Sequence, residues 1–212
     1  MKKLFIMPAG MMLISIAAFT PVSTKLTSIA HKTNGAAFAH VPAKWTLDKT
    51  HSNVIFSVTH LVVSDVEGSF KSFDGTMENS KDDFSDAKIN FIVDVKSINT
   101  DNENRDKHLK SDDFLNAEKF PQMKFESTSF QPLGDNKYKL SGNLTIRDIT
   151  KPVSFDVKYG GTANMMGTHI GFKAKTTINR FDYNLKWDKT IEAGGLIAGK
   201  DVDITINVDF KK

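Results

Sequence analysis

Apolar and polar residues alternate with a period of two over most of the chain, and this pattern restricts the fold more than any other feature. Successive side chains of a β-strand point to opposite faces, so each alternating run predicts a strand with one face toward an interior. Such runs occur within residues 45–75, 87–98, 123–146 and 153–178, and a further run lies near the C-terminus. Together these runs predict eight or nine strands. That last run is the clearest and contains Val202, Ile204, Ile206, Val208 and Phe210.

Short turns separate the predicted strands. Turn-forming residues lie at 134–136, 148–152 and 160–161, and at Gly194-Gly195. Connections this short imply that consecutive strands pair antiparallel, because parallel pairs need crossover connections of about a dozen residues. A long meander protects its edges best when it closes on itself. We therefore expect an all-β, up-and-down antiparallel barrel.

Two segments interrupt the alternation. Residues 100–121 are polar and charged. Thr100 or Asp101 is placed to cap one short helix or helical turn and Ser111 to cap another, and Pro121 ends the segment. We expect this segment to lie across one end of the barrel or against its outside, where it covers a sheet edge or a cavity mouth. Residues 185–200 contain Trp187 and a glycine-rich stretch, and we expect them to form the opposite loop or a lid.

The first 39 residues are typical of a secretory signal peptide. Lys2 and Lys3 precede an apolar run over residues 4–19, and Ala37-Phe38-Ala39 fits a small-x-small cleavage site, with residues 28–30 as an earlier alternative. The run is shorter than the roughly 20 residues that a membrane-spanning helix needs. Residues 1–39 are therefore predicted to be removed, leaving residues 40–212 as one domain that is not an integral membrane protein.

Charge and cysteine content exclude two classes of protein. The leader holds four lysines and no acid, so its removal lowers the formal net charge by four, from +3 to −1. Nucleic-acid binding thereby loses its only support from composition. The chain has no cysteine, so an exported domain would derive its stability from a core and from sheet pairing rather than from disulfides.

Motifs in four blocks follow one another in a fixed order along the chain. They comprise Thr50-His51-Ser52 with Phe56-x-Val58-x-His60-Leu61 and Gly68-x-Phe70-x-x-Phe73-x-Gly75, residues 97–100 with 105–111 and 120–127, residues 142–147 with 150–153, and residues 178–183 with 202–204. Together they resemble the YceI family of bacterial lipid-binding proteins over about residues 43–210. Asp148 and Tyr183-Asn184 depart from the family pattern, at turns or strand ends where they affect local turn shape.

The resemblance implies an eight-stranded antiparallel, lipocalin-like barrel with one or two short helices, exported to the periplasm and often a homodimer. It also implies a ligand, a long apolar chain such as a polyisoprenoid or an isoprenoid quinone, held inside the barrel. No other cofactor is expected.

Apolar side chains dominate the predicted interior. Barrels of eight strands are either filled by their own side chains or hold one small ligand, and the residues alone leave both interpretations open. The resemblance favours a cavity, whose ligand would be a hydrocarbon because no buried acid or base is predicted there. The predicted lipid-binding residues are Val54, Phe56, Val58, Phe70, Phe91, Val93, Phe125, Leu144, Ile146, Phe155, Phe172, Ile178, Ile204 and Ile206.

Five cationic or titratable residues are candidates for contact with a lipid head group: His60, Arg105, His108, Lys110 and Arg180. If residues 100–121 cover the barrel mouth, these side chains could meet a phosphate or a quinone, and arginine would supply paired donors. The alternative is that Arg105 and Arg180 make local ion pairs and strand-end contacts that hold the loops.

The sequence does not predict an enzyme. It has no Gly-x-Ser-x-Gly motif and no cysteine nucleophile, and His51 and Ser52 are strand neighbours that point to opposite faces. The histidines lack the spacing of a metal site, so no metal is predicted. Three hypotheses remain: a periplasmic lipid carrier or store, a redox partner that uses His60, His108 or His169, and a filled barrel that acts as a stress-response or interaction module.

Overall fold

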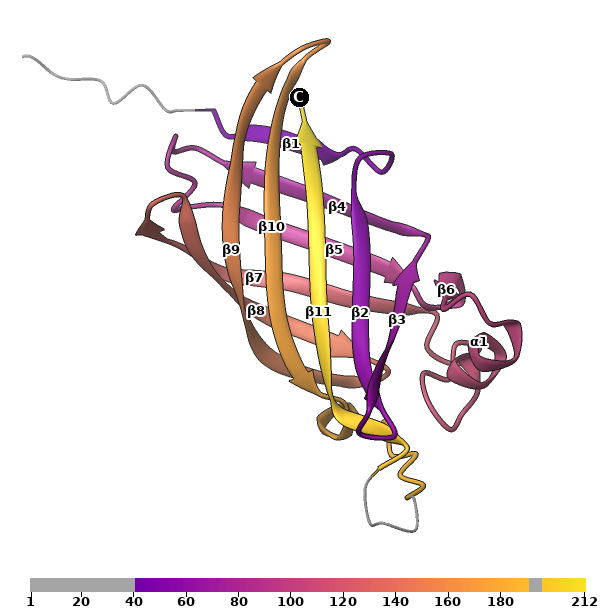
Figure 1. Ribbon diagram of the computed structural model, residues 1–212. Coiled ribbons are helices and arrows are strands. Elements are labelled where there is room, and N and C mark those ends of the chain that lie inside the picture. Colours follow the sequence, from indigo (N-terminus) through magenta and orange to yellow (C-terminus); the bar gives the residue numbers. More distant parts are fainter. Residues whose placement is uncertain (1–40, 191–195) are drawn as a thin grey trace, which may run out of the picture. The chain divides into compact units, whose positions relative to one another are not determined.

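A computed structural model describes residues 41–190 and 196–212. The predicted leader over residues 1–39, its cleavage sites and the Gly194-Gly195 turn lie outside the described residues. Eleven strand segments form one antiparallel sheet (Figure 1). They are β1 (Ala43–Leu47), β2 (Asn53–His60), β3 (Ser64–Phe70), β4 (Phe73–Asn79), β5 (Lys88–Asp94), β6 (Ile98–Asn99), β7 (Gln122–Gly134), β8 (Lys137–Ile146), β9 (Ile149–Asn164), β10 (Thr168–Asn179) and β11 (Ala198–Lys211).

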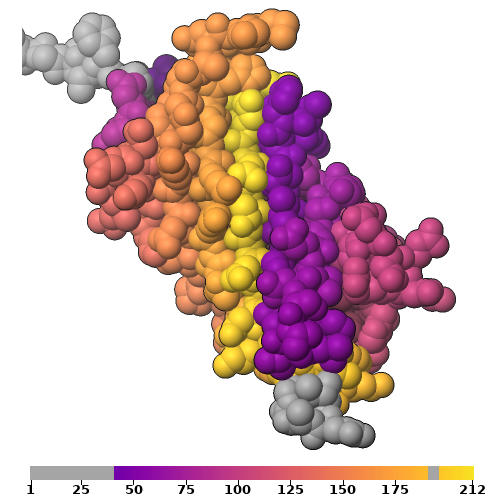
Figure 2. All heavy atoms as spheres, viewed as in Figure 1, coloured from indigo at the N-terminus to yellow at the C-terminus, as the bar shows by residue number. Residues whose placement is uncertain are grey.

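The eleven segments make a closed barrel of eight strands, because three barrel strands are each broken in two. β1 and β2 lie end to end along β11, with Thr46 opposite Lys211 and Asn53 opposite Asn207. β4 and β3 pair with β1 and β2 respectively, and β5 and β6 pair with β4 and β3. The predicted eight-stranded antiparallel, lipocalin-like barrel is confirmed. Figure 2 shows β2 running beside β11 on one face.

The break between β1 and β2 is held by side chains. Asp48 accepts a hydrogen bond from the Thr50 N–H at 3.0 Å, and the Ser52 hydroxyl donates to the Asp48 carbonyl at 2.7 Å. The same hydroxyl accepts from the Asp209 N–H of β11 at 3.0 Å. Burial acts to raise the pKa of Asp48, but hydrogen bonds from His51, Thr50 and Lys211 lower it to about 2. Asp48 thus stabilises the bend as a carboxylate.

The two short helices or helical turns predicted over residues 100–121 are, in the structure, turns after Ser111 and one α-helix before it. This helix is α1 (Glu103–Lys110), capped by Asn102, whose Oδ1 accepts from the Arg105 N–H, rather than by Thr100 or Asp101. Ser111 ends this helix instead of starting a second one, because its hydroxyl and N–H both donate back to the His108 carbonyl. Asn116 then has a positive φ of 48°, which a helix does not tolerate, and the chain continues in turns. Two 3₁₀ turns, η1 (Val95–Ser97) and η2 (Arg180–Tyr183), lie at strand ends.

The segment around α1 connects β6 to β7, at the end of the barrel where these two strands are not paired with each other. β5 pairs with β7 as far as Asp94 and Gln122, whereas β6 pairs with β3 (Figure 1). The chain between β6 and β7 contributes Leu109, Phe114 and Leu115 to the barrel interior. We call this end of the barrel the mouth. The prediction that this segment covers a cavity mouth agrees with that position.

The opposite end of the barrel is filled by aromatic side chains. The Phe84 ring contacts three other rings edge-on, with centroid distances of 5.5 to 6.5 Å. Phe130 stacks on Tyr138 at 4.7 Å. Rings that meet in this way exclude water and leave little free space. The barrel is therefore closed at this end by Phe84, Phe130, Tyr138, Tyr159 and Phe172.

Candidate functional site

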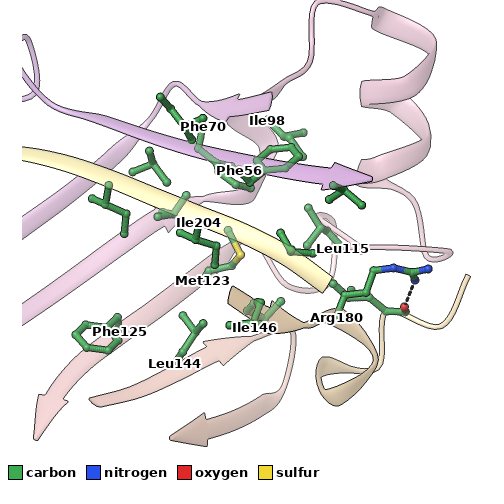
Figure 3. Close-up of a pocket in the computed structure, with 18 of the residues that line it drawn as sticks. Phe56, Phe70, Ile98, Leu115, Met123, Phe125, Leu144, Ile146, Arg180 and Ile204 are labelled. Atoms are coloured by element: carbon green, nitrogen blue, oxygen red, sulfur yellow. Dashed lines mark hydrogen bonds between the residues drawn. The ribbon is translucent and has the colours of Figure 1, made fainter. Parts of the chain in front are cut away.

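The barrel encloses a cavity of about 340 Å³. This volume falls in the range of roughly 300–1,000 Å³ that is typical of single-ligand sites. All fourteen residues predicted from the sequence to bind lipid line the cavity, and whether they contact a lipid stays a prediction. Figure 3 shows Phe56 and Phe70 on one wall, across from Phe125 and Leu144.

The sequence prediction missed part of the wall. Leu109, Leu115, Ile98 and Met123 also line the cavity (Figure 3 labels the last three). Leu109 and the Phe114-Leu115 pair are apolar residues in a charged segment, so only their contrast with the surrounding charged residues could have indicated that they face inward. Trp187 and Ile197 line the cavity from the segment after η2.

Three phenylalanine rings lie flat against glycines of neighbouring strands. A Cβ atom at Gly68 would overlap the Phe56 ring, one at Gly75 would meet Phe91 at 2.6 Å, and one at Gly142 would overlap Phe125. Gly68 and Gly75 lie directly opposite Phe56 and Phe91 in the sheet. The missing side chains let the rings lie along the wall, and this arrangement keeps the centre of the barrel open.

Polar groups of the wall are concentrated at the mouth. His60, Arg105, His108 and Arg180, four of the five predicted head-group residues, line the cavity, whereas Lys110 does not. Thr59 and Lys124 are the other polar side chains of the wall, and no acid of residues 41–190 or 196–212 lines it. An uncharged, hydrocarbon-like body with a neutral or anionic end would fit these surroundings.

Arg180 is buried, with 3% of its surface exposed, and each of its three guanidinium nitrogens donates a hydrogen bond, one of which Figure 3 draws. It donates to the carbonyls of Leu185, Ala198 and Gly199 at 2.5, 2.9 and 2.8 Å, and it stacks over the Phe181 ring at 4.4 Å. Burial lowers its pKa, and the nearby Asp188 acts in the opposite direction. These contacts support the alternative drawn from the sequence, in which Arg180 holds the loop after η2.

Arg105 does not form a local ion pair with its neighbour Asp106, and both side chains bind Thr100 instead. Arg105 donates to the hydroxyl and the carbonyl of Thr100 at 2.8 and 2.6 Å. Asp106 accepts from the N–H and the hydroxyl of the same threonine at 2.9 and 2.6 Å. The two side chains instead fix the start of α1 through Thr100, and Arg105 is half-buried at the cavity wall.

His108 belongs to a cluster that joins three segments at the mouth. Its ring meets Phe114 and Trp187 edge-on at 5.0 and 5.5 Å, and the Phe114 and Trp187 rings are 5.4 Å apart. Its Nε2 lies 2.8 Å from an oxygen of Asp113. We call His108, Phe114 and Trp187 the mouth cluster.

Arg147 was noted in the sequence only as part of a motif, and the structure gives it a positional role. Its Nη1 donates to the carbonyls of Phe114 and Asn184, both at 3.2 Å, and its Nη2 contacts Asp112 at 3.1 Å. It thereby connects the turn after α1 with the segment after η2. Its partners are 33 to 37 residues away in sequence, so no local pattern could have identified them.

The histidines of the redox hypothesis do not gather in one place. His60 and His108 line the cavity, but His169 lies near the closed end and pairs with Asp209 at 2.9 Å. The part of the chain that the structure describes contains no group of three His, Asp or Glu residues placed to hold a metal. Across residues 41–190 and 196–212, no helix has the length and hydropathy to cross a membrane.

The YceI-like domain model matches residues 45–210, which confirms the resemblance drawn from the motifs. A UPF0312 protein of Staphylococcus aureus (strain N315) is 38% identical over 169 residues, which span 78% of this chain and 96% of that protein. The YCEI protein of Campylobacter jejuni superposes with a TM-score of 0.63 at 30% identity, covering 73% of this chain and 89% of that one. A polyisoprenoid binding domain from Saccharophagus degradans has a TM-score of 0.58 at 13% identity, covering 79% and 97%.

Proposed function

Because this chain belongs to the YceI-like domain family, we propose that its barrel binds one long-chain apolar lipid, a polyisoprenoid or an isoprenoid quinone. The observation that carries the proposal is the 340 Å³ cavity, whose wall is apolar except at the mouth. The Saccharophagus degradans neighbour is named for polyisoprenoid binding, but at 13% identity that likeness concerns the fold alone. The argument therefore rests on the cavity of this chain.

The apolar wall supplies the affinity. Burying a hydrocarbon chain contributes about 0.8 kcal/mol per methylene group before the cost of ordering the chain. A few methylene groups therefore outweigh any single polar contact at the mouth. The site accordingly selects for a long apolar body rather than for a particular head group.

The mouth is the place for the polar end of the ligand. Arg180 is committed to three carbonyls, whereas Arg105 uses Nε and Nη2 on one threonine and lies at the wall beside His108. A quinone or phosphate oxygen would find its donors there. Arg105 and His108 are thus the head-group candidates with the best position.

The biological role proposed for the barrel is that of an exported carrier or store, without catalysis. The leader-like composition of residues 1–39 supports export to the periplasm. The open cavity favours this role over a filled barrel that acts only through its outer surface. The separate positions of His60, His108 and His169 give the redox hypothesis no specific support.

Mass spectrometry of an organic extract tests the proposal. The protein is purified without detergent from its native compartment, alongside an equal amount of an unrelated exported protein. We expect a polyprenyl or quinone species in stoichiometric amount in the first extract alone. An empty extract, combined with failure to take up added polyprenyl lipid, would contradict the proposal.

A further inference from the structure

The tip of the β2–β3 hairpin exposes three consecutive apolar residues. Leu61, Val62 and Val63 have 36%, 67% and 84% of their surfaces exposed. The Val63 N–H donates to the His60 carbonyl at 3.2 Å, which closes a turn around Leu61 and Val62. Both central residues have positive φ angles, 51° and 65°. Turns of this kind favour Asn-Gly, and a β-branched residue with positive φ is an outlier.

This tip therefore departs from local preference in two ways. It presents apolar side chains to water, and it places valine in a conformation that glycine adopts without strain. Departures of this kind occur where function imposes them. A contact that covers the tip would account for both.

The tip lies beside the mouth of the cavity. Thr59 and His60, the last residues of β2, line the cavity. The Leu61 N–H donates to the carbonyl of Ile197 at 2.9 Å, and Ile197 also lines the cavity. In Figure 1 the tip and the start of β11 lie at the same end of the barrel. The apolar tip thus adjoins the mouth of the cavity, next to Thr59 and His60.

A second exposed apolar tip lies at the closed end of the barrel. Met165 and Met166, between β9 and β10, are 72% and 97% exposed, and Met166 also has a positive φ. The neighbouring Thr168 exchanges backbone hydrogen bonds with Lys212. Lys212 follows the last residue of β11, whereas Ile197 precedes its first residue, so the two tips lie at opposite ends of β11. Exposure alone does not distinguish the two tips, but only the Leu61–Val63 tip adjoins the cavity.

We propose that the Leu61–Val63 tip inserts into the surface of a lipid bilayer and brings the cavity mouth against it. The inference rests on the proposed function, because a long apolar ligand resides in a bilayer and is costly to pass through water. A docked mouth would let the chain move between bilayer and barrel without that exposure.

The charges near the tip indicate how it docks. Asp65 and Glu67 on β3 and Lys200 and Asp201 on β11 are all exposed, so both signs are present. Docking therefore depends on apolar insertion rather than on attraction to anionic lipid. The four named charges sum to −2, so binding should not require an anionic lipid such as phosphatidylglycerol.

The test compares two matched double variants. Val62→Gly/Val63→Ser removes the apolar tip and relieves the strained turn, and Met165→Ser/Met166→Gly makes the equivalent change at the closed end. Each processed protein, with its N-terminus verified by intact mass, is sedimented with phosphatidylcholine vesicles. The transfer of a fluorescent polyprenyl lipid between donor and acceptor vesicles is then timed. Equilibrium binding of the same lipid, delivered from cyclodextrin, is measured separately.

The tip variant should lose about tenfold or more in vesicle binding and in transfer rate. Its cyclodextrin-delivered binding should stay unchanged and its melting temperature should not fall, while the methionine variant should behave as the wild type. Vesicle binding and transfer within about twofold of wild type in the tip variant would overturn docking. Docking would also be overturned if the wild type were a dimer and the tip variant a monomer, because the tip would then contact a second copy of the chain. Failure of every protein to bind cyclodextrin-delivered lipid would instead refute the proposed function, and vesicle sedimentation would still decide docking.

Discussion

Replacing Gly68 with alanine should narrow the cavity and weaken lipid binding, at a small cost in the stability of the barrel. The new Cβ would lie 2.7 Å from both the Phe56 Cε1 and the Thr100 Cγ2, and closer still to the Phe56 Cζ. Ordinary contacts begin at 3.4 Å, so these atoms overlap by at least 0.7 Å. Thr100 is held by Arg105 and Asp106 and cannot yield. The Phe56 ring must therefore swing into the cavity.

The free space beside Phe56 limits the energetic cost. Overpacking a core costs about 1–3 kcal/mol, and a ring that can move into a void should lie near the lower limit. Gly142→Ala provides the contrast, because its Cβ would also overlap the backbone carbonyl of Glu126, which cannot rotate away. We expect a loss of about 1 kcal/mol in the free energy of unfolding for Gly68→Ala and about 3 kcal/mol for Gly142→Ala.

Urea denaturation gives the two stabilities, and titration with a polyprenyl lipid gives the binding affinity. Gly68→Ala should bind lipid at least about tenfold more weakly. Adding Phe56→Leu to it removes the overlapping ring atoms and should restore binding. Wild-type affinity in Gly68→Ala, or a larger loss of stability there than in Gly142→Ala, would refute the explanation that glycine keeps the phenylalanine rings against the wall.

Three further predictions concern polar groups whose contacts affect the stability of the fold. Arg180→Met leaves three carbonyls without their donor and should lower the free energy of unfolding by about 3 kcal/mol in urea denaturation, with Arg180→Lys recovering only part of the loss. The pKa of Asp48 is lowered from 3.8 to about 2, so its carboxylate stabilises the fold above pH 3.8 and this contribution is lost as the pH falls toward 2. Asp48→Asn should flatten that part of the pH dependence of the urea midpoint, and an unchanged profile would contradict the assignment. The Tyr183 hydroxyl is buried without a hydrogen-bond partner among the described residues, and burial raises its pKa to about 12. Tyr183→Phe should equal or exceed the wild-type melting temperature, most clearly as the pH rises from 10 toward 12, where the wild type loses stability.

The sequence alone determined the strands and their inward faces. Alternation is a local property, since each side chain of a strand points away from the next one whatever the partner strand is. For that reason the fourteen residues selected from period-two runs all lie on the cavity wall. The short turns likewise predicted antiparallel neighbours, and the closed barrel followed from the need to protect its edges.

The tertiary structure decided what depends on partners distant in the sequence. The breaks in three barrel strands follow from which strand each half pairs with, as when β1 and β2 share β11. Ser111 ends a helix rather than starting one, because His108 takes its hydrogen bonds. Arg180 could be a ligand contact or a loop clamp by sequence, and three backbone carbonyls favour the clamp. Whether the barrel is filled or open depends on side-chain volumes summed over eight strands, and on phenylalanine rings that lie over glycines of the next strand.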